Sequence, residues 1–114
     1  MANRMSPDTQ KLLLEYENVE KQLQVLILQK HQIQLQLNEI KLAEEEIKKA
    51  EGEIYKSVGS VMVKSTKQSA ETDLKERKEM LEMRMGSIGK QEEKLRERLT
   101  GSQKKLQDEM KKAG

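Results

Sequence analysis

The chain contains no cysteine, no phenylalanine and no tryptophan, and its only aromatic residues are two tyrosines. Without cysteine it forms no disulfide and offers no thiolate to a metal ion. Without Phe and Trp it lacks the side chains that usually dominate a compact core. The composition therefore argues against an ordinary globular domain.

An excess of charge of one sign is also missing, and so are long hydrophobic runs. The 22 Lys and Arg residues nearly balance the 20 Asp and Glu residues, with both signs interspersed. Neither half has the basic footprint that nucleic-acid binding requires. No run approaches the roughly 20 apolar residues of a membrane span, and the N-terminus lacks the apolar region of a signal peptide. We expect a soluble, cytoplasmic protein with no nucleic-acid or membrane partner.

Residue patterns typical of catalysis are absent from the sequence. His31 is the only histidine, and it falls on the face of its expected helix that points to solvent. Consecutive residues of a helix point in different directions, so the run Glu44-Glu45-Glu46 is a solvated charge run and not a carboxylate pair. No glycine-rich phosphate loop, Ser/His/Asp set or metal-ligand spacing occurs. We predict that the chain is not an enzyme and uses no metal or cofactor.

The chain is rich in charge, at 37%, and its apolar residues follow a heptad repeat. Ser6-Pro7 reads as a helix start, with Ser as the N-cap and Pro at the first helical position. The repeat that follows predicts a helix over about 7–49 and makes disorder a poor interpretation. Its stripe consists of Leu12, Tyr16, Val19, Leu23, Leu26, Lys30, Ile33, Leu37, Ile40, Glu44 and Ile47.

A second stripe predicts another helix, over about 67–112. Its members are Leu74, Lys78, Leu81, Met85, Ile88, Glu92, Leu95, Leu99, Ser102 and Leu106. Gly86, Gly89 and Gly101 lie within it, and each costs about 1 kcal/mol relative to Ala in a helix interior. They either soften the helix, allow another chain to approach closely, or are simply tolerated at exposed positions.

Two striped helices joined at one folding point bury their stripes by packing antiparallel against each other. The best register pairs residues whose numbers add to 118, such as Leu23 with Leu95. It places Lys30 opposite Ile88, so no two charges meet in the interior layers. The same register folds the chain about Gly59.

The residues between the helices predict a β-hairpin over about 54–65. β-Branched and aromatic residues flank Gly59-Ser60, a pair typical of a two-residue turn in which Gly supplies the positive φ. Gly52 is a plausible C-cap of the first helix. A lone hairpin is marginal in water and has two unpaired edges, so it is either a decorative loop or an assembly element. The candidate assembly residues are Ile54, Tyr55, Val58, Gly59, Val61 and Val63.

With this hairpin, the chain resembles the β-class subunit of archaeal-type prefoldin. The string Tyr55-Lys56-Ser57-Val58-Gly59 is similar to that family's Tyr-Lys-x-Val-Gly hairpin, and the first helix is similarly rich in Gln. One hairpin with a short connection suits the β class, since the α class carries two. The resemblance covers essentially the whole chain, so we expect residues 1–114 to form a single prefoldin-like domain.

The resemblance implies a mainly α fold, namely a long antiparallel two-helix coiled coil with a single β-hairpin at the junction. It also implies assembly through the strands into a hexamer of two α-class and four β-class subunits. The implied function is that of an ATP-independent chaperone without a cofactor. It would hold unfolded polypeptides at the coiled-coil tips and deliver them to a group II chaperonin.

The chain ends are the candidate client-binding tip. Leu12-Leu13-Leu14 is wider than one stripe needs, so we expect at least one of these leucines to be exposed. The full candidate set is Met5, Leu12, Leu13, Leu14, Leu106 and Met110. Packing and fraying of the helix ends is the alternative for these residues, and Met80 and Met83 have no clear role. For the whole chain, the alternative function is a structural coiled-coil adaptor that docks a fixed protein partner.

Overall fold

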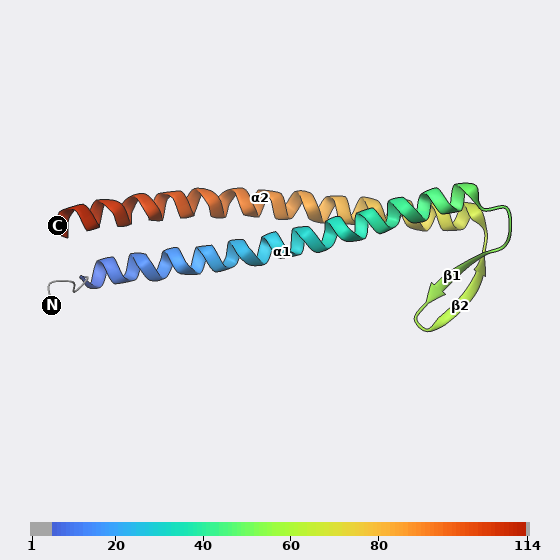
Figure 1. The fold of residues 1–114 in the computed structure, drawn as a ribbon, viewed down its shortest axis with the longest axis horizontal. Helices are drawn as coiled ribbons and strands as arrows, with labels where there is room; N and C mark the ends of the chain where they lie inside the picture. Colours follow the sequence, from blue (N-terminus) through green and yellow to red (C-terminus); the bar gives the residue numbers. More distant parts are fainter. Residues whose placement is uncertain (1–5, 114) are drawn as a thin grey trace. The chain divides into compact units, whose positions relative to one another are not determined.

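The computed structural model describes residues 6–113. The chain forms α1 (Pro7–Lys49), β1 (Ile54–Val58), β2 (Val61–Ser65) and α2 (Lys67–Ala113) in that order (Figure 1). The predicted fold class is confirmed, because one antiparallel β-hairpin joins two long helices. Within the described range, no helix has the length and apolar character needed to cross a membrane.

Helix α1 begins at the predicted cap. The Ser6 hydroxyl oxygen accepts a hydrogen bond from the Thr9 backbone N–H at 3.1 Å, which satisfies one of the free donors of the first turn. At the other end, only the predicted cap differs. The helix stops at Lys49 and its last turn closes through the Ala50 N–H to the Ile47 carbonyl at 3.2 Å. Gly52 is therefore not the C-cap, and its φ is not positive.

Helix α2 is capped in the same way, by Thr66. The Thr66 hydroxyl oxygen accepts a hydrogen bond from the Ser69 N–H at 3.0 Å. The helix then continues without interruption through Gly86, Gly89 and Gly101. A Cβ added at any of the three would meet no atom within 4 Å, so no other segment of the chain approaches them closely.

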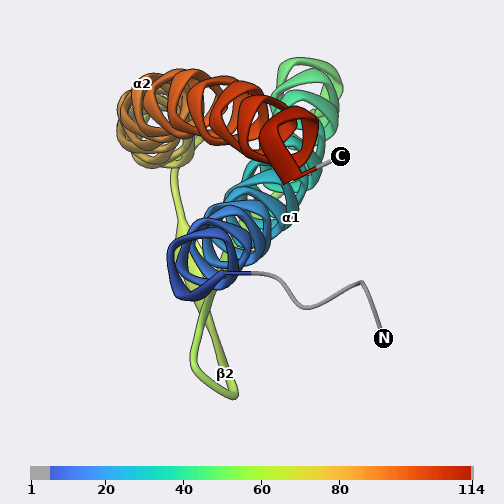
Figure 2. The same ribbon diagram turned by 90° about the vertical axis from the view of Figure 1, so that its left-hand side faces the viewer.

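The chain divides into two compact units, each containing part of both helices. The first unit comprises Met1–Lys30 and Ser87–Gly114. Its α1 and α2 segments run antiparallel, and Figure 2 looks at the end where α1 begins and α2 finishes. The buried apolar side chains are Val19, Leu23, Leu26 and Ile88, of which Val19 is only 1% exposed. All four lie on the predicted stripes.

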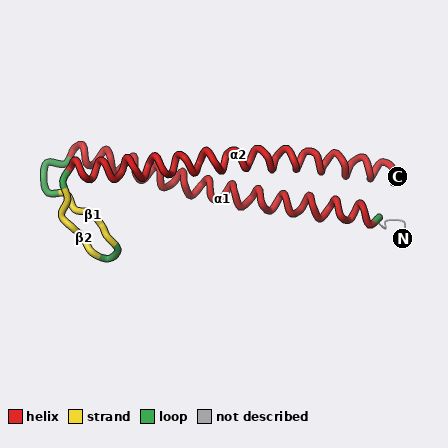
Figure 3. The backbone as a smooth tube through the Cα atoms, turned by 180° about the vertical axis from the view of Figure 1, so that it is seen from behind, coloured by secondary structure: helices red, strands yellow, loops and turns green. Residues whose placement is uncertain are grey.

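The second unit comprises His31–Gly86. Its buried apolar side chains, Ile33, Ile40 and Leu81, again lie on the stripes. The hairpin belongs to this unit and projects to one side of the unit's own helix segments, connected by short loops (Figure 3). In the hairpin, Val58 pairs with Val61 across the turn. Gly59 has φ 61° and Ser60 a negative φ, which is the pattern of a type II′ turn and confirms the predicted role of Gly59.

Candidate functional site

The hairpin presents a bare apolar face. Directly paired residues of an antiparallel ladder lie on the same side of the sheet, so the register places Ile54, Val58, Val61 and Val63 together on one side, here called the valine face. Val58, Val61 and Val63 are 54%, 58% and 46% exposed. Since both strand edges are also unpaired, this surface is well suited to being covered by another strand or sheet.

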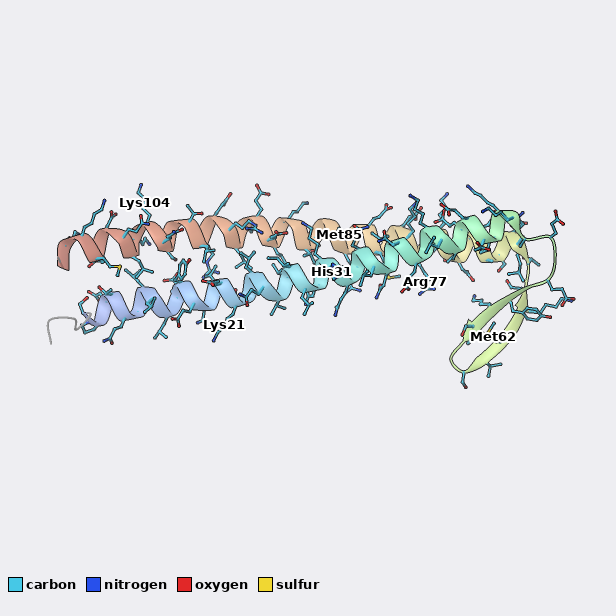
Figure 4. The ribbon with its side chains drawn as sticks, in the orientation of Figure 1. Lys21, His31, Met62, Arg77, Met85 and Lys104 are labelled. Carbon is cyan, nitrogen blue, oxygen red and sulfur yellow. The ribbon has the colours of Figure 1, made fainter. Side chains whose placement is uncertain are left out.

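The opposite face of the hairpin is more polar. It carries Tyr55 and Met62, which are 51% and 64% exposed. Met62 is labelled in Figure 4. The Tyr55 hydroxyl donates a 2.5 Å hydrogen bond to the Glu53 carboxylate, and Lys64 lies 3.1 Å from the same group. These contacts, the Tyr55 hydrogen bond first, lower the pKa of Glu53. The same hydrogen bond raises the pKa of Tyr55.

An ion pair ties the hairpin to a helix. The Lys56 ammonium group, on the side of the valine face, contacts the Asp73 carboxylate of α2. The two side chains are 50% and 35% exposed. Lys56 is also the lysine of the Tyr-Lys-x-Val-Gly string. The ion pair therefore gives that lysine a contact between the hairpin and α2.

A second ion pair joins the helices of the first unit. The Lys30 ammonium lies 3.2 Å from the Glu92 carboxylate, which Arg96 also contacts at 2.9 Å. The predicted register places Lys30 opposite Ile88, and its flexible side chain reaches a carboxylate about one turn away from that position. Hydrogen bonds from Arg96 and then Lys30 lower the pKa of Glu92. Two charged breaks in the stripes thus offset each other.

The candidate tip residues differ in exposure. Leu14 and Met110 are 63% and 59% exposed, whereas Leu12, Leu13 and Leu106 are half-buried. The prediction that at least one leucine of the triplet is exposed is therefore confirmed. Both exposed side chains belong to the first unit, and Met5 lies outside the described residues.

The sequence analysis missed a row of leucines on α1. Leu28, Leu35 and Leu42 are 58%, 50% and 62% exposed, and their seven-residue spacing places them on one face of the helix. We call them the outer leucines. The signal was a second heptad repeat, offset by two residues from the stripe. On α2, Met80 and Met83 are 61% and 76% exposed.

Nothing in the described residues suggests catalysis. His31 is exposed on α1 (Figure 4), as are Glu45 and Glu46. Between Ser6 and Ala113, no group of three or more His, Cys, Asp or Glu side chains could hold a metal ion.

These features define a class of protein: helical-hairpin subunits whose joining β-hairpin offers an uncovered apolar face. Comparison with known proteins narrows the class. A family model described as prefoldin subunit matches residues 10–113. The chain is 38% identical over 106 residues to prefoldin subunit beta of Archaeoglobus fulgidus, with 91% of each chain covered. It is 40% identical over 103 residues to that of Pyrococcus furiosus, covering 89% of this chain and 88% of the relative.

A solved structure gives the same result. The crystal structure of the prefoldin beta subunit from Thermococcus strain KS-1 matches with a TM-score of 0.84 and 37% identity, covering 92% of this chain and 94% of the other. The chain belongs to the prefoldin family, and within it to the archaeal-type β class. Membership supports a role as a chaperone subunit that assembles with other prefoldin subunits.

Proposed function

We propose that this chain, acting as one prefoldin-like domain, is a cytoplasmic chaperone subunit that holds unfolded polypeptides without ATP. Four copies would join two α-class subunits in a hexamer, which would pass its clients to a group II chaperonin. The observation that carries the proposal is the combination of family membership with apolar side chains left exposed at the helix ends and on the hairpin. Holding a non-native chain requires exposed apolar groups and no shaped catalytic site.

Assembly through the valine face is the first part of the proposal. An Asp placed there would be buried against the apolar surface of a neighbouring subunit, and burial of an unpaired charge is strongly unfavourable. Val61 and Met62 are adjacent and similarly exposed, at 58% and 64%, but they lie on opposite faces of the hairpin. They therefore provide a matched pair of variants.

The chain would be mixed with an α-class prefoldin subunit, and the mass of the complex measured by native mass spectrometry. We expect Val61→Asp to reduce the hexamer at least tenfold at a fixed concentration while circular dichroism retains the helical signal. Met62→Asp should assemble much as the unsubstituted chain does. Full-size complexes with Val61→Asp would show that the valine face is not the joint.

Client holding at the helix ends is the second part. Leu14 and Met110 are exposed enough to be replaced by Ser without opening a cavity in the core. Leu42 and Met83, which are 62% and 76% exposed, offer a control pair of the same residue types in the second unit. The assay is light scattering during dilution of a denatured, aggregation-prone protein, without nucleotide.

We expect Leu14→Ser with Met110→Ser to suppress aggregation several-fold less well than the unsubstituted chain, at unchanged assembly. The Leu42→Ser and Met83→Ser control should protect normally. If instead the Leu42→Ser and Met83→Ser variant lost protection and the helix-end variant kept it, the client would bind in the second unit, where the outer leucine Leu42 lies. That outcome would favour the second candidate function, a coiled-coil adaptor for a fixed partner, because a heptad-spaced leucine row is the pattern that a partner helix recognises.

A further inference from the structure

The first unit carries a groove that includes none of the residues proposed for assembly or for client holding. Its volume is about 500 Å³, within the range of about 300–1,000 Å³ typical of ligand-binding clefts. Apolar, amide and cationic side chains from both helices line it. They are Val25, Leu26 and Leu95, then Gln22 and Gln91, and finally Lys94 and Arg98.

The polar groups of this groove are largely unused by the chain itself. Within residues 6–113, neither the amide of Gln22 nor that of Gln91 forms a hydrogen bond, and Lys94 forms no ion pair. The Arg98 guanidinium lies 4.0 Å from the Glu15 carboxylate, and both side chains are more than half exposed. Such a contact holds the guanidinium only weakly. Val25 is 54% exposed, so an apolar contact is available beside the charges.

Another side of α2 has the opposite charge. A shallow depression of about 510 Å³ there is lined by residues of α2 alone, with three glutamates, Glu92, Glu93 and Glu97, against one arginine, Arg96, which pairs with Glu92. The charged residues that line the groove are therefore both cationic, whereas those of the depression carry an excess of negative charge. A difference of this kind selects between partners by charge and steers the favoured one toward the groove.

We infer that the groove binds an extended peptide segment in which apolar residues alternate with Asp or Glu. An apolar side chain of the segment would pack on Val25 and Leu95, and its carboxylates would reach Lys94 and Arg98. Guanidinium–carboxylate pairs can be bidentate, which favours Arg at such a position. The amides of Gln22 and Gln91 each offer donors and an acceptor to a peptide backbone. The inference rests on the proposed chaperone function and adds a charge preference to it.

The test uses two fluorescein-labelled dodecapeptides and the full-length chain. In one peptide Leu alternates with Asp, and in the other Leu alternates with Lys. Binding is followed by fluorescence anisotropy at 50 mM and 500 mM salt. We expect the acidic peptide to bind roughly fivefold more tightly at low salt, from two exposed charge pairs, and the difference to shrink at high salt.

Charge reversal at the groove supplies the decisive comparison. Lys94→Glu with Arg98→Glu should abolish or invert the preference. Lys90→Glu with Lys104→Glu changes the net charge equally on exposed positions of the same helix that do not line the groove, and Lys104 points away from α1 (Figure 4). This control should keep the preference. Val25→Ser should weaken both peptides by a similar factor of about two to five.

Equal binding of the two peptides by the unsubstituted chain would overturn the inference, and so would identical behaviour of the two charge-reversal variants. A change in oligomeric mass caused by Lys94→Glu with Arg98→Glu would also overturn it, since a neighbouring subunit would then cover the groove. A chain that prevents aggregation but binds the two peptides equally would refute the inferred charge preference of the groove and leave the proposed function standing. A chain that fails to prevent aggregation would refute the proposed function.

Discussion

Breaking the Lys56–Asp73 ion pair is expected to weaken assembly without unfolding the hairpin. The pair connects the strand that carries the valine face to α2, so its loss lets the hairpin sample directions in which that face no longer meets a neighbour. Partly exposed ion pairs contribute about 0.2–1 kcal/mol each. With side chains 50% and 35% exposed, this pair falls in that range and is weakened by salt.

The effect adds over the copies in a complex. If four copies assemble, independent losses sum to about 0.8–4 kcal/mol, which corresponds to between a few-fold and several-hundred-fold in the assembly constant. The assay is a dilution series of the complex with an α-class subunit, with masses measured by mass photometry at 50 mM salt. The complex of the Lys56→Met variant should dissociate at a higher concentration than the complex of the unsubstituted chain. The Asp73→Asn variant should behave in the same way as Lys56→Met.

Two further variants separate orientation from charge. The swap Lys56→Asp with Asp73→Lys restores an ion pair between the same positions and should recover most of the assembly. Lys64→Met removes the ion pair in which the Lys64 ammonium lies 3.1 Å from the Glu53 carboxylate. This pair does not involve α2, so the Lys64→Met variant should assemble nearly normally. Failure of the swap to recover assembly, or equal losses in Lys56→Met and Lys64→Met, would refute the reasoning.

Two other predictions concern packing and titration. Val19 is 1% and Val25 54% exposed on the same helix. Val19→Ala should therefore lower the free energy of unfolding by about 2 kcal/mol, from lost burial plus a cavity, and Val25→Ala by well under 1 kcal/mol. Urea unfolding followed by circular dichroism measures both losses, and equal losses would contradict the assigned core. In a Tyr16→Phe background, an ultraviolet titration reports Tyr55 alone. Its pKa is raised by the hydrogen bond to Glu53, and the same bond lowers the pKa of Glu53. The bond therefore stabilises the hairpin around neutral pH, and its contribution is lost as the pH rises through the raised pKa of Tyr55 or falls through the lowered pKa of Glu53. Glu53→Gln should lower the midpoint, and an unchanged midpoint would show that the hydrogen bond does not form in solution.

The core could be predicted from spacing alone. Val19, Leu23, Ile33, Ile40 and the other buried apolar residues all fall on the two stripes, because a heptad repeat fixes which side of a helix meets its partner. The hairpin turn was equally predictable, since the conformation at Gly59 requires a positive φ that Gly adopts without strain. Both are local or periodic properties, and the sequence displays them directly.

Contacts made by long side chains could not be predicted in this way. Lys30 reaches Glu92, and Lys56 reaches Asp73, through flexible stems whose ends lie several ångströms from the backbone position that a register specifies. Their partners depend on how closely the helices approach and on the direction in which the hairpin leaves them. The Gly52 prediction was wrong for a related reason. The last turn of α1 closes by a backbone hydrogen bond from Ala50, so no left-handed residue is needed.

The arrangement of exposed apolar residues on α1 suggests how a holding chaperone avoids binding to itself. Leu35 is 50% exposed, yet the residues three and four positions away from it, His31, Gln32, Asn38 and Glu39, are all polar. Neighbours at these spacings surround a helix side chain, so Leu35 does not merge into a continuous apolar patch of the size that drives association. The valine face, by contrast, gathers four apolar residues on one side of the hairpin, and it is the surface proposed to be covered on assembly. Isolated apolar side chains each bind a non-native chain weakly, and several helix pairs acting together in one complex would raise the affinity through effective concentration. Such a protein can hold an unfolded client while remaining dispersed in its absence.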